Sequence, residues 1–227
     1  TAYRRQRQMC IRDRYAYDGT PNPMPGSNIP MAALGAWILW LGWFGFNGGS
    51  ELKVSEVSSA TAVSQVFLNT NMAAAGGVLT AMLMSLIMTG KMDVTMAING
   101  AIAGLVSITA DPLSPSGGMA ILVGAIGGAI VYFSIVFLEN AGVDDPVGAI
   151  SAHGTVGIFG VLAVAFTGGA SFMGQLIGVL MIAGFTYLAS LGTILVIDKL
   201  IMPIRASDAE QEAGLDISEV GLSLIHI

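Results

Sequence analysis

A single histidine, His153, lies in the apolar and glycine-rich stretch AISAHGTVGIFG at residues 149–160. A neutral imidazole can donate a hydrogen bond from one ring nitrogen and accept one at the other, so it can hold a small polar molecule. In a bilayer, a polar side chain of this kind must find a partner or line a cavity. The alternative is a structural histidine whose ring bonds to a neighbouring backbone carbonyl.

A second set of side chains lies in the stretch LGWFGFNGGS at residues 41–50. Trp43, Phe46 and Ser50 are spaced i, i+3 and i+7, so they share one face of a helix. Ser50 offers a hydroxyl oxygen as an acceptor at the end of this face, and Phe46 lies one turn deeper. Ordinary helix packing is the alternative interpretation of the stripe.

The composition predicts the elements that must position these side chains. Apolar residues make up 54% of the chain, charged residues 11%, and 30 residues are glycine. Small residues allow transmembrane helices to approach closely. We therefore expect an all-α membrane protein with about six transmembrane helices, at roughly residues 30–49, 60–89, 95–110, 118–138, 146–167 and 173–202.

Residues that commonly cap helices precede two of these segments. Ser27 or Asn28 can cap the first segment. Asp144 and Asp145 directly precede Pro146, which is expected at the first position of the fifth helix. We interpret the two carboxylates as helix-capping acids and not as a catalytic pair.

Other polar residues and glycines in the segments are expected to serve helix packing. Gly154 and Gly157 should permit a close helix contact that holds the His153 ring in place. Five polar side chains are expected to bond between helices and not to touch a substrate: Gln65, Asn69, Thr70, Asn71 and Asn99.

The two ends of the chain depart from this pattern. Residues 1–14, TAYRRQRQMCIRDR, contain 5 of the 9 basic residues and the only cysteine, and residues 220–227, VGLSLIHI, follow an acidic stretch. We interpret both as non-native, adapter-like segments; a genuine basic flank is the alternative for the first. The membrane domain then covers 15–202 and a tail covers 203–219. Without the two ends, one histidine and no cysteine remain, which excludes disulfides and Cys/His metal sites.

The basic residues of the loops predict the orientation. If the segments cross the membrane alternately, Lys91 and Arg205 lie on one side and Lys53 on the other. The positive-inside rule then places the tail in the cytoplasm. We expect the chain to lie in the cell inner (plasma) membrane.

Several stretches resemble the Amt/Mep/Rh ammonium transporters. They are LGWFGFNGGS, NTNMAAAGG, NGAIAGLVSITA, DDPVGAISAHG and RASDAEQEAGLDISE, and the resemblance covers roughly residues 16–219. It implies a fold of eleven helices in two inverted halves of five plus a final long helix, assembled as a homotrimer with a path through each protomer. This chain resembles helices six to eleven, the second inverted repeat and the final helix.

The resemblance also implies roles for the site residues. His153 matches the second of two histidines near the membrane midplane, where inverted halves meet. Ser50 would help to hold ammonium at the external vestibule, with cation–π attraction worth roughly 0.5 to 2 kcal/mol. Phe46 would belong to the gate below, and Trp43 would line the path. Because a bare ion costs up to ~20 kcal/mol to move into hydrocarbon, such a path favours ammonia, and we expect a neutral His153 ring.

The function implied is ammonium/ammonia transport by a channel-like transporter that is inactive without its N-terminal half. The alternative is an ammonium-sensing receptor domain of a signalling protein. The tail residues Arg205, Gly214, Leu215 and Asp216 match the region that responds to PII-class nitrogen regulators. The sequence contains no nucleotide motif, phosphate loop or catalytic triad, so we expect no enzyme activity, no cofactor, no metal and no nucleic-acid partner.

Overall fold

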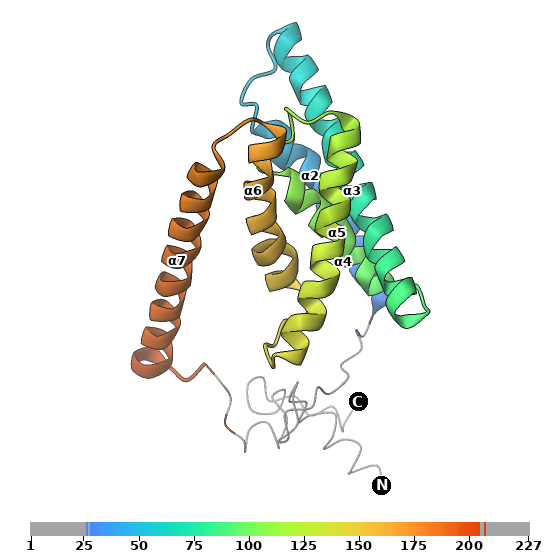
Figure 1. Cartoon of the computed structure of the whole chain (residues 1–227). Coiled ribbons are helices and arrows are strands. Elements are labelled where there is room, and N and C mark those ends of the chain that lie inside the picture. Colours follow the sequence, from blue (N-terminus) through green and yellow to red (C-terminus); the bar gives the residue numbers. More distant parts are fainter. Residues whose placement is uncertain (1–25, 27, 205–206, 208–227) are drawn as a thin grey trace, which may run out of the picture. The chain divides into compact units, whose positions relative to one another are not determined.

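The computed structural model describes residue 26, residues 28–204 and residue 207, and within these residues it contains helices and no strand (Figure 1). It divides into two compact units, whose described parts are residues 26 and 28–180, and residues 181–204 with 207. The elements are α2 (Ile29–Gly49), α3 (Val57–Thr89), α4 (Val94–Ile108), α5 (Gly117–Asn140), η1 (Ile150–Thr155), α6 (Val156–Thr167), α7 (Phe172–Val196) and η2 (Ile197–Ile201).

The expected all-α membrane architecture is confirmed. Among the described residues, five helical spans are long and apolar enough to cross a membrane: α2, α3, α5, η1 with α6, and α7 with η2. The sixth, α4, is a shorter apolar helix of 15 residues. Within the first unit, the loops at 50–56, 109–116 and 168–171 lie at one end of the bundle and those at 90–93 and 141–149 at the other (Figure 1). This is the arrangement that alternate membrane crossings require.

Capping residues fix several helix ends. The Asn28 side chain accepts a hydrogen bond from the Met31 amide at 2.9 Å, so the predicted cap of α2 is confirmed for Asn28, while Ser27 lies outside the described residues. Gly90 ends α3 in the left-handed conformation with φ 75°, which a residue without a Cβ adopts readily. Asp93 then caps α4 by accepting from the Thr95 amide.

The start of the fifth span differs from the prediction. Its helical turns begin at Ile150 and not at Pro146, which lies in a turn. Gly148 has φ 69°, and its amide donates to the Asp145 carbonyl at 3.1 Å, so the chain closes a tight turn before the helix starts. A proline restrains only its own φ and therefore does not prevent this delay.

Asp145 nevertheless caps the span as predicted. One carboxylate oxygen accepts from the Ile150 amide, and the other accepts from both the amide and the hydroxyl of Ser151, all at 3.0 Å. Ser151 is fully buried. The carboxylate therefore clamps the first turn of η1, a π-helical turn that contains His153.

Glycines bring the backbones of α3, α4 and α5 into contact. A Cβ on Gly77 of α3 would lie 2.2 Å from the carbonyl oxygen of Gly100 on α4. A Cβ on Gly128 of α5 would lie 2.4 Å from the Gly77 oxygen, and one on Gly124 2.0 Å from the oxygen of Ala73. No side chain fits at these positions, so the three helices form one close-packed unit.

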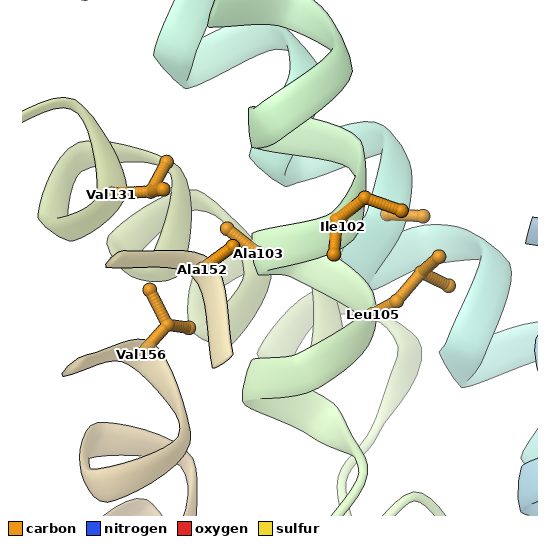
Figure 2. Packing of buried hydrophobic residues seen from close by; sticks show 7 residues of the cluster. Ile102, Ala103, Leu105, Val131, Ala152 and Val156 are labelled. Carbon is orange, nitrogen blue, oxygen red and sulfur yellow. The ribbon is translucent and has the colours of Figure 1, made fainter. Parts of the chain in front are cut away.

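A cluster of buried apolar side chains extends this unit to η1 and α6. Its members are Ala74, Ile102, Ala103, Leu105, Val131, Ala152 and Val156, six of which are labelled in Figure 2. Three come from α4, which therefore lies at the centre of the cluster. Trp40 and Trp43 of α2 pack against the same cluster, so it holds α2 and η1 in one assembly.

Polar side chains add contacts between the elements. The Asn47 amide donates to the Thr70 hydroxyl at 3.0 Å and joins α2 to α3. Asn69, also buried, donates to the carbonyls of Pro112 and Pro115 at 2.9 and 2.7 Å and ties the loop after α4 to α3. The predicted bond between helices is thus confirmed for Thr70, whereas Asn69 bonds to a loop and not to a second helix.

The same prediction is wrong for two other residues. Gln65 donates to Asn69 within α3, and Asn99 donates to the Thr95 carbonyl within α4, because each partner lies four residues away on the same helical face. Asn71 is exposed, and its side chain has no hydrogen bond in the part of the chain that the structure describes.

Replacing Gly124 by leucine should destabilise the bundle. The new side chain would meet the α3 backbone, and overpacking of this kind costs about 1 to 3 kcal/mol or more. Gly118 is the matched control on the same helix, because a Cβ there meets nothing within 4 Å. We expect a lower thermal unfolding midpoint in detergent for Gly124→Leu than for Gly118→Leu. Equal midpoints for the two variants would contradict the close contact.

Asp145→Asn should destabilise the protein more than Asp93→Asn does. Asp145 uses both carboxylate oxygens as acceptors, so an asparagine would turn its NH2 group toward the donor of Ile150 or those of Ser151 and cost about 1 to 3 kcal/mol. Asp93 uses a single oxygen, which an asparagine carbonyl can replace at a cost of about 0.5 kcal/mol or less. Thermal unfolding midpoints check the difference, and a larger loss for Asp93→Asn would refute the clamp.

Candidate functional site

Trp43 is anchored by a hydrogen bond to α4's C-terminal end. Its indole Nε1 donates to the Thr109 hydroxyl at 2.8 Å, and that hydroxyl donates to the Leu105 carbonyl at 2.6 Å. Both Trp43 and Thr109 are half-buried. The two bonds leave the indole little freedom to rotate, so its plane is fixed relative to α4.

Thr109 was not among the residues predicted from the sequence. Its role in orienting the indole depends on how α2 crosses α4, which the sequence does not state. The sequence feature that could have indicated Thr109 is its hydroxyl side chain at the end of an apolar segment, in the stretch NGAIAGLVSITA.

The rings of Trp43, Phe46 and His153 form one continuous group. The Trp43 and His153 ring centroids lie 6.3 Å apart with the planes inclined by 17°, a stacked arrangement. The Trp43 and Phe46 centroids lie 5.7 Å apart at 58°. Residues predicted from two separate stretches of the sequence therefore meet at one site.

His153 presents its imidazole on an exposed side of η1. In the described residues its ring has no hydrogen bond to a backbone carbonyl or to any other group, so the structural alternative of a carbonyl-bonded histidine is not found. The π-helical turn from Ile150 to Thr155 carries the ring, and single π turns occur frequently at functional sites. Both ring nitrogens are free to bind a small molecule.

The glycines that follow His153 do not make the contact expected of them. A Cβ on Gly154 would meet only Ile150 of its own turn at 3.8 Å, and one on Gly157 would lie 3.8 Å from Val106, both ordinary distances. Gly160, one turn further, makes the close approach, with a Cβ position 2.8 Å from the Ser107 carbonyl. Packing against α4 thus uses Gly160, and the ring is held by the clamped first turn of η1.

Ser50 lies at the C-terminal end of α2, one helical turn beyond Phe46. Its hydroxyl donates to the Phe46 carbonyl at 3.0 Å, which leaves the oxygen lone pairs available as acceptors. Phe46 has 64% of its surface exposed, and Ser50 is exposed as well. Along the predicted face of α2, the polar Ser50 side chain therefore lies at the helix end, and the rings of Phe46 and Trp43 precede it.

The helices that carry Trp43, Phe46 and His153 have no charged side chains. Neither α2 nor the span formed by η1 and α6 contains an Asp, Glu, Lys or Arg. The surface formed by the rings of Trp43, Phe46 and His153 therefore offers two aromatic rings and an imidazole but no fixed charge. The remaining predicted residues, Arg205, Gly214, Leu215 and Asp216, lie outside the described residues.

Curated relatives similar to this chain include ammonium transporters. Amt2 of Archaeoglobus fulgidus is 38% identical over 91% of this chain and 47% of its own length. Amt2 of Methanocaldococcus jannaschii is 36% identical over 89% of this chain and 48% of its own length. The chain thus spans about half the length of these relatives.

Solved structures show the same fold. A Sensor Amt Protein matches with a TM-score of 0.83 and 30% identity over 96% of this chain and 56% of its own. Mep2 of Candida albicans matches with a TM-score of 0.71 and 27% identity over 81% of this chain and 44% of its own. The Ammonium Transporter Family matches residues 8–224. With this match, the chain belongs to the Ammonium Transporter Family.

Proposed function

We propose that this chain supplies the C-terminal membrane part of a channel-like ammonium/ammonia transporter, with Trp43, Phe46 and His153 along the conduction path. The observation that carries the proposal is the exposed imidazole of His153, which is stacked on Trp43 and has no hydrogen bond within the described residues. A buried structural histidine would have its ring nitrogens bonded by the protein. Free nitrogens on a fixed ring suit a small hydrogen-bonding substrate.

The apolar character of the path favours ammonia over the intact ammonium ion. No side-chain charge in α2, η1 or α6 compensates a cation there, and moving a bare ion into hydrocarbon costs up to ~20 kcal/mol before relaxation. Ammonia can accept a hydrogen bond from one imidazole nitrogen and donate to another. His153 would therefore bind the neutral molecule after the cation has given up its proton.

Ser50 and Phe46 would receive the cation at the mouth of the path. The Ser50 hydroxyl is committed to the Phe46 carbonyl as a donor and therefore offers its oxygen as an acceptor. The exposed Phe46 ring adds cation–π attraction of roughly 0.5 to 2 kcal/mol, depending on desolvation. Below this point Phe46 and the anchored Trp43 would form the gate and wall of the path.

We propose further that the path is complete only when a second membrane half covers this face. The chain spans about half the length of its curated relatives. The face includes Phe46, exposed over 64% of its surface, and the exposed His153. An imidazole left in lipid without a partner is disfavoured, so the chain alone should not conduct.

The same proposal includes the oligomeric state, the membrane and the partner of the complete protein. It would be a homotrimer in the cell inner (plasma) membrane, with Lys91 and Arg205 on the cytoplasmic side. A PII-class nitrogen regulator would dock at the cytoplasmic tail, where Arg205, Gly214, Leu215 and Asp216 match the family pattern.

A second candidate function is an ammonium-sensing receptor domain. The observation in its favour is the similarity to a Sensor Amt Protein, with a TM-score of 0.83. The two functions differ in what a complete gene encodes after the tail. A kinase or cyclase sequence there would favour sensing.

Transport through His153 is testable in proteoliposomes that contain the complete protein and a trapped pH-sensitive dye. An ammonium pulse should make the lumen alkaline, because ammonia enters and binds protons there. His153→Ala should reduce this shift to the rate of empty vesicles. Leu79→Ala, at a position exposed on α3 outside the site, is the control and should retain the wild-type rate.

Two results would contradict the proposal. One is an alkaline shift for His153→Ala equal to that of the wild type. The other is an absence of any shift for a wild-type protein that is folded and correctly inserted.

A further inference from the structure

The residue directly after Ser50 is a carboxylate that has no partner among the described residues. Glu51 continues the last turn of α2, because its amide donates to the Gly48 carbonyl at 3.2 Å. Its side chain is half-buried, yet it makes no hydrogen bond or ion pair with any residue that the structure describes. Carboxylates removed from water are normally paired, so this one has an unused capacity to bind a cation.

The other charges of the loop at 50–56 compensate each other. Lys53 donates to the carboxylate of Glu56 and forms an ion pair with it, and both side chains are largely exposed. Glu51 is therefore the only uncompensated charge in this described loop. It gives the loop that follows α2 a net negative charge at the residue next to Ser50.

The backbone keeps Glu51 with the helix and separates it from the ion pair. Leu52 has φ 57°, the only positive value of a non-glycine residue in the described chain, and its amide still donates to the Gly49 carbonyl at 3.1 Å. A leucine in the left-handed region is unfavourable and is kept only where the surrounding structure requires it. The helical turn thus ends at Leu52, after Glu51 and before Lys53.

We propose that Glu51 is a recruiting residue of the substrate path, whose negative charge raises the local concentration of ammonium at Ser50. This inference rests on the proposed transport function and extends it to a residue outside the three-ring group. A charge at the mouth of a path with low-dielectric walls concentrates counter-ions there, and salt screens the effect over about 10 Å at 0.1 M. Glu51 should therefore act on substrate capture and not on the passage through the path.

The test compares Glu51→Gln with Glu56→Gln in the complete transporter, using the ammonium pulse in proteoliposomes. Both substitutions remove one negative charge from the same loop, but only Glu51 adjoins Ser50. At low ionic strength we expect Glu51→Gln to raise the KM for ammonium about twofold to fivefold, the range of an exposed charge interaction. The maximal rate should stay unchanged, Glu51→Asp should restore the wild-type KM, and Glu56→Gln should shift KM by less than about 1.5-fold.

Ionic strength separates this charge effect from a change in shape. At about 1 M salt, where the Debye length is about 3 Å, the KM values of wild type and Glu51→Gln should converge. Ser50→Ala removes a direct contact and should therefore raise KM at both salt concentrations.

Three results would overturn the inference: an unchanged KM for Glu51→Gln at low salt, an equal shift for Glu56→Gln, or a shift that persists at high salt. If the wild type shows no uptake while folded in the membrane, the proposed function itself fails and takes this inference with it. If the wild type and Glu51→Gln behave alike while His153→Ala is inactive, only the inference about Glu51 fails.

Discussion

The backbone contact of α3 with α4 and α5 is the constraint on which the rest of the bundle depends. Gly77 lies against the Gly100 carbonyl, and Gly124 lies against that of Ala73, at distances that leave no room for a Cβ. In a membrane, where burial of apolar surface does not drive association between helices, such close approach is a principal source of packing energy. It places α4 at the centre of the bundle, and α4 in turn anchors the Trp43 indole through Thr109 and supports η1 through the apolar cluster.

Several polar side chains that are buried or half-buried in this bundle are bonded by the protein, in contrast to the exposed ring of His153. Asn47 and Thr70 bond to each other, Asn69 bonds to two loop carbonyls, and the Asp145 carboxylate binds the first turn of η1. The imidazole of His153 stands at the end of that clamped turn without a hydrogen bond among the residues described. A fixed ring with free nitrogens is what a site for a small polar substrate requires, because the protein orients the ring but leaves its bonding capacity unused.

The sequence predicted the helices more completely than the site. Six apolar segments and the stripe of Trp43, Phe46 and Ser50 follow from composition and helical spacing, which are local properties. The stacking of Trp43 on His153 joins residues far apart in the chain, and only the packing around α4 brings them together. The start of the fifth span was predicted too early, because a proline before a helix does not reveal that Gly148 closes a turn first. Gly160 and not Gly154 makes the close contact, since a glycine's neighbours depend on which helix face meets α4.

The most direct test asks whether a second membrane half covers the face that holds the three rings. The chain is incorporated into membranes containing a photoreactive lipid, alone and together with the N-terminal half of an ammonium transporter, and labelled positions are read by mass spectrometry. We expect Phe46 and His153 to be labelled in the chain alone and protected in the pair, while Leu79 and Leu83 on the exposed side of α3 are labelled in both. Equal labelling of His153 with and without the second half would contradict the proposal that this face is one wall of a conduction path.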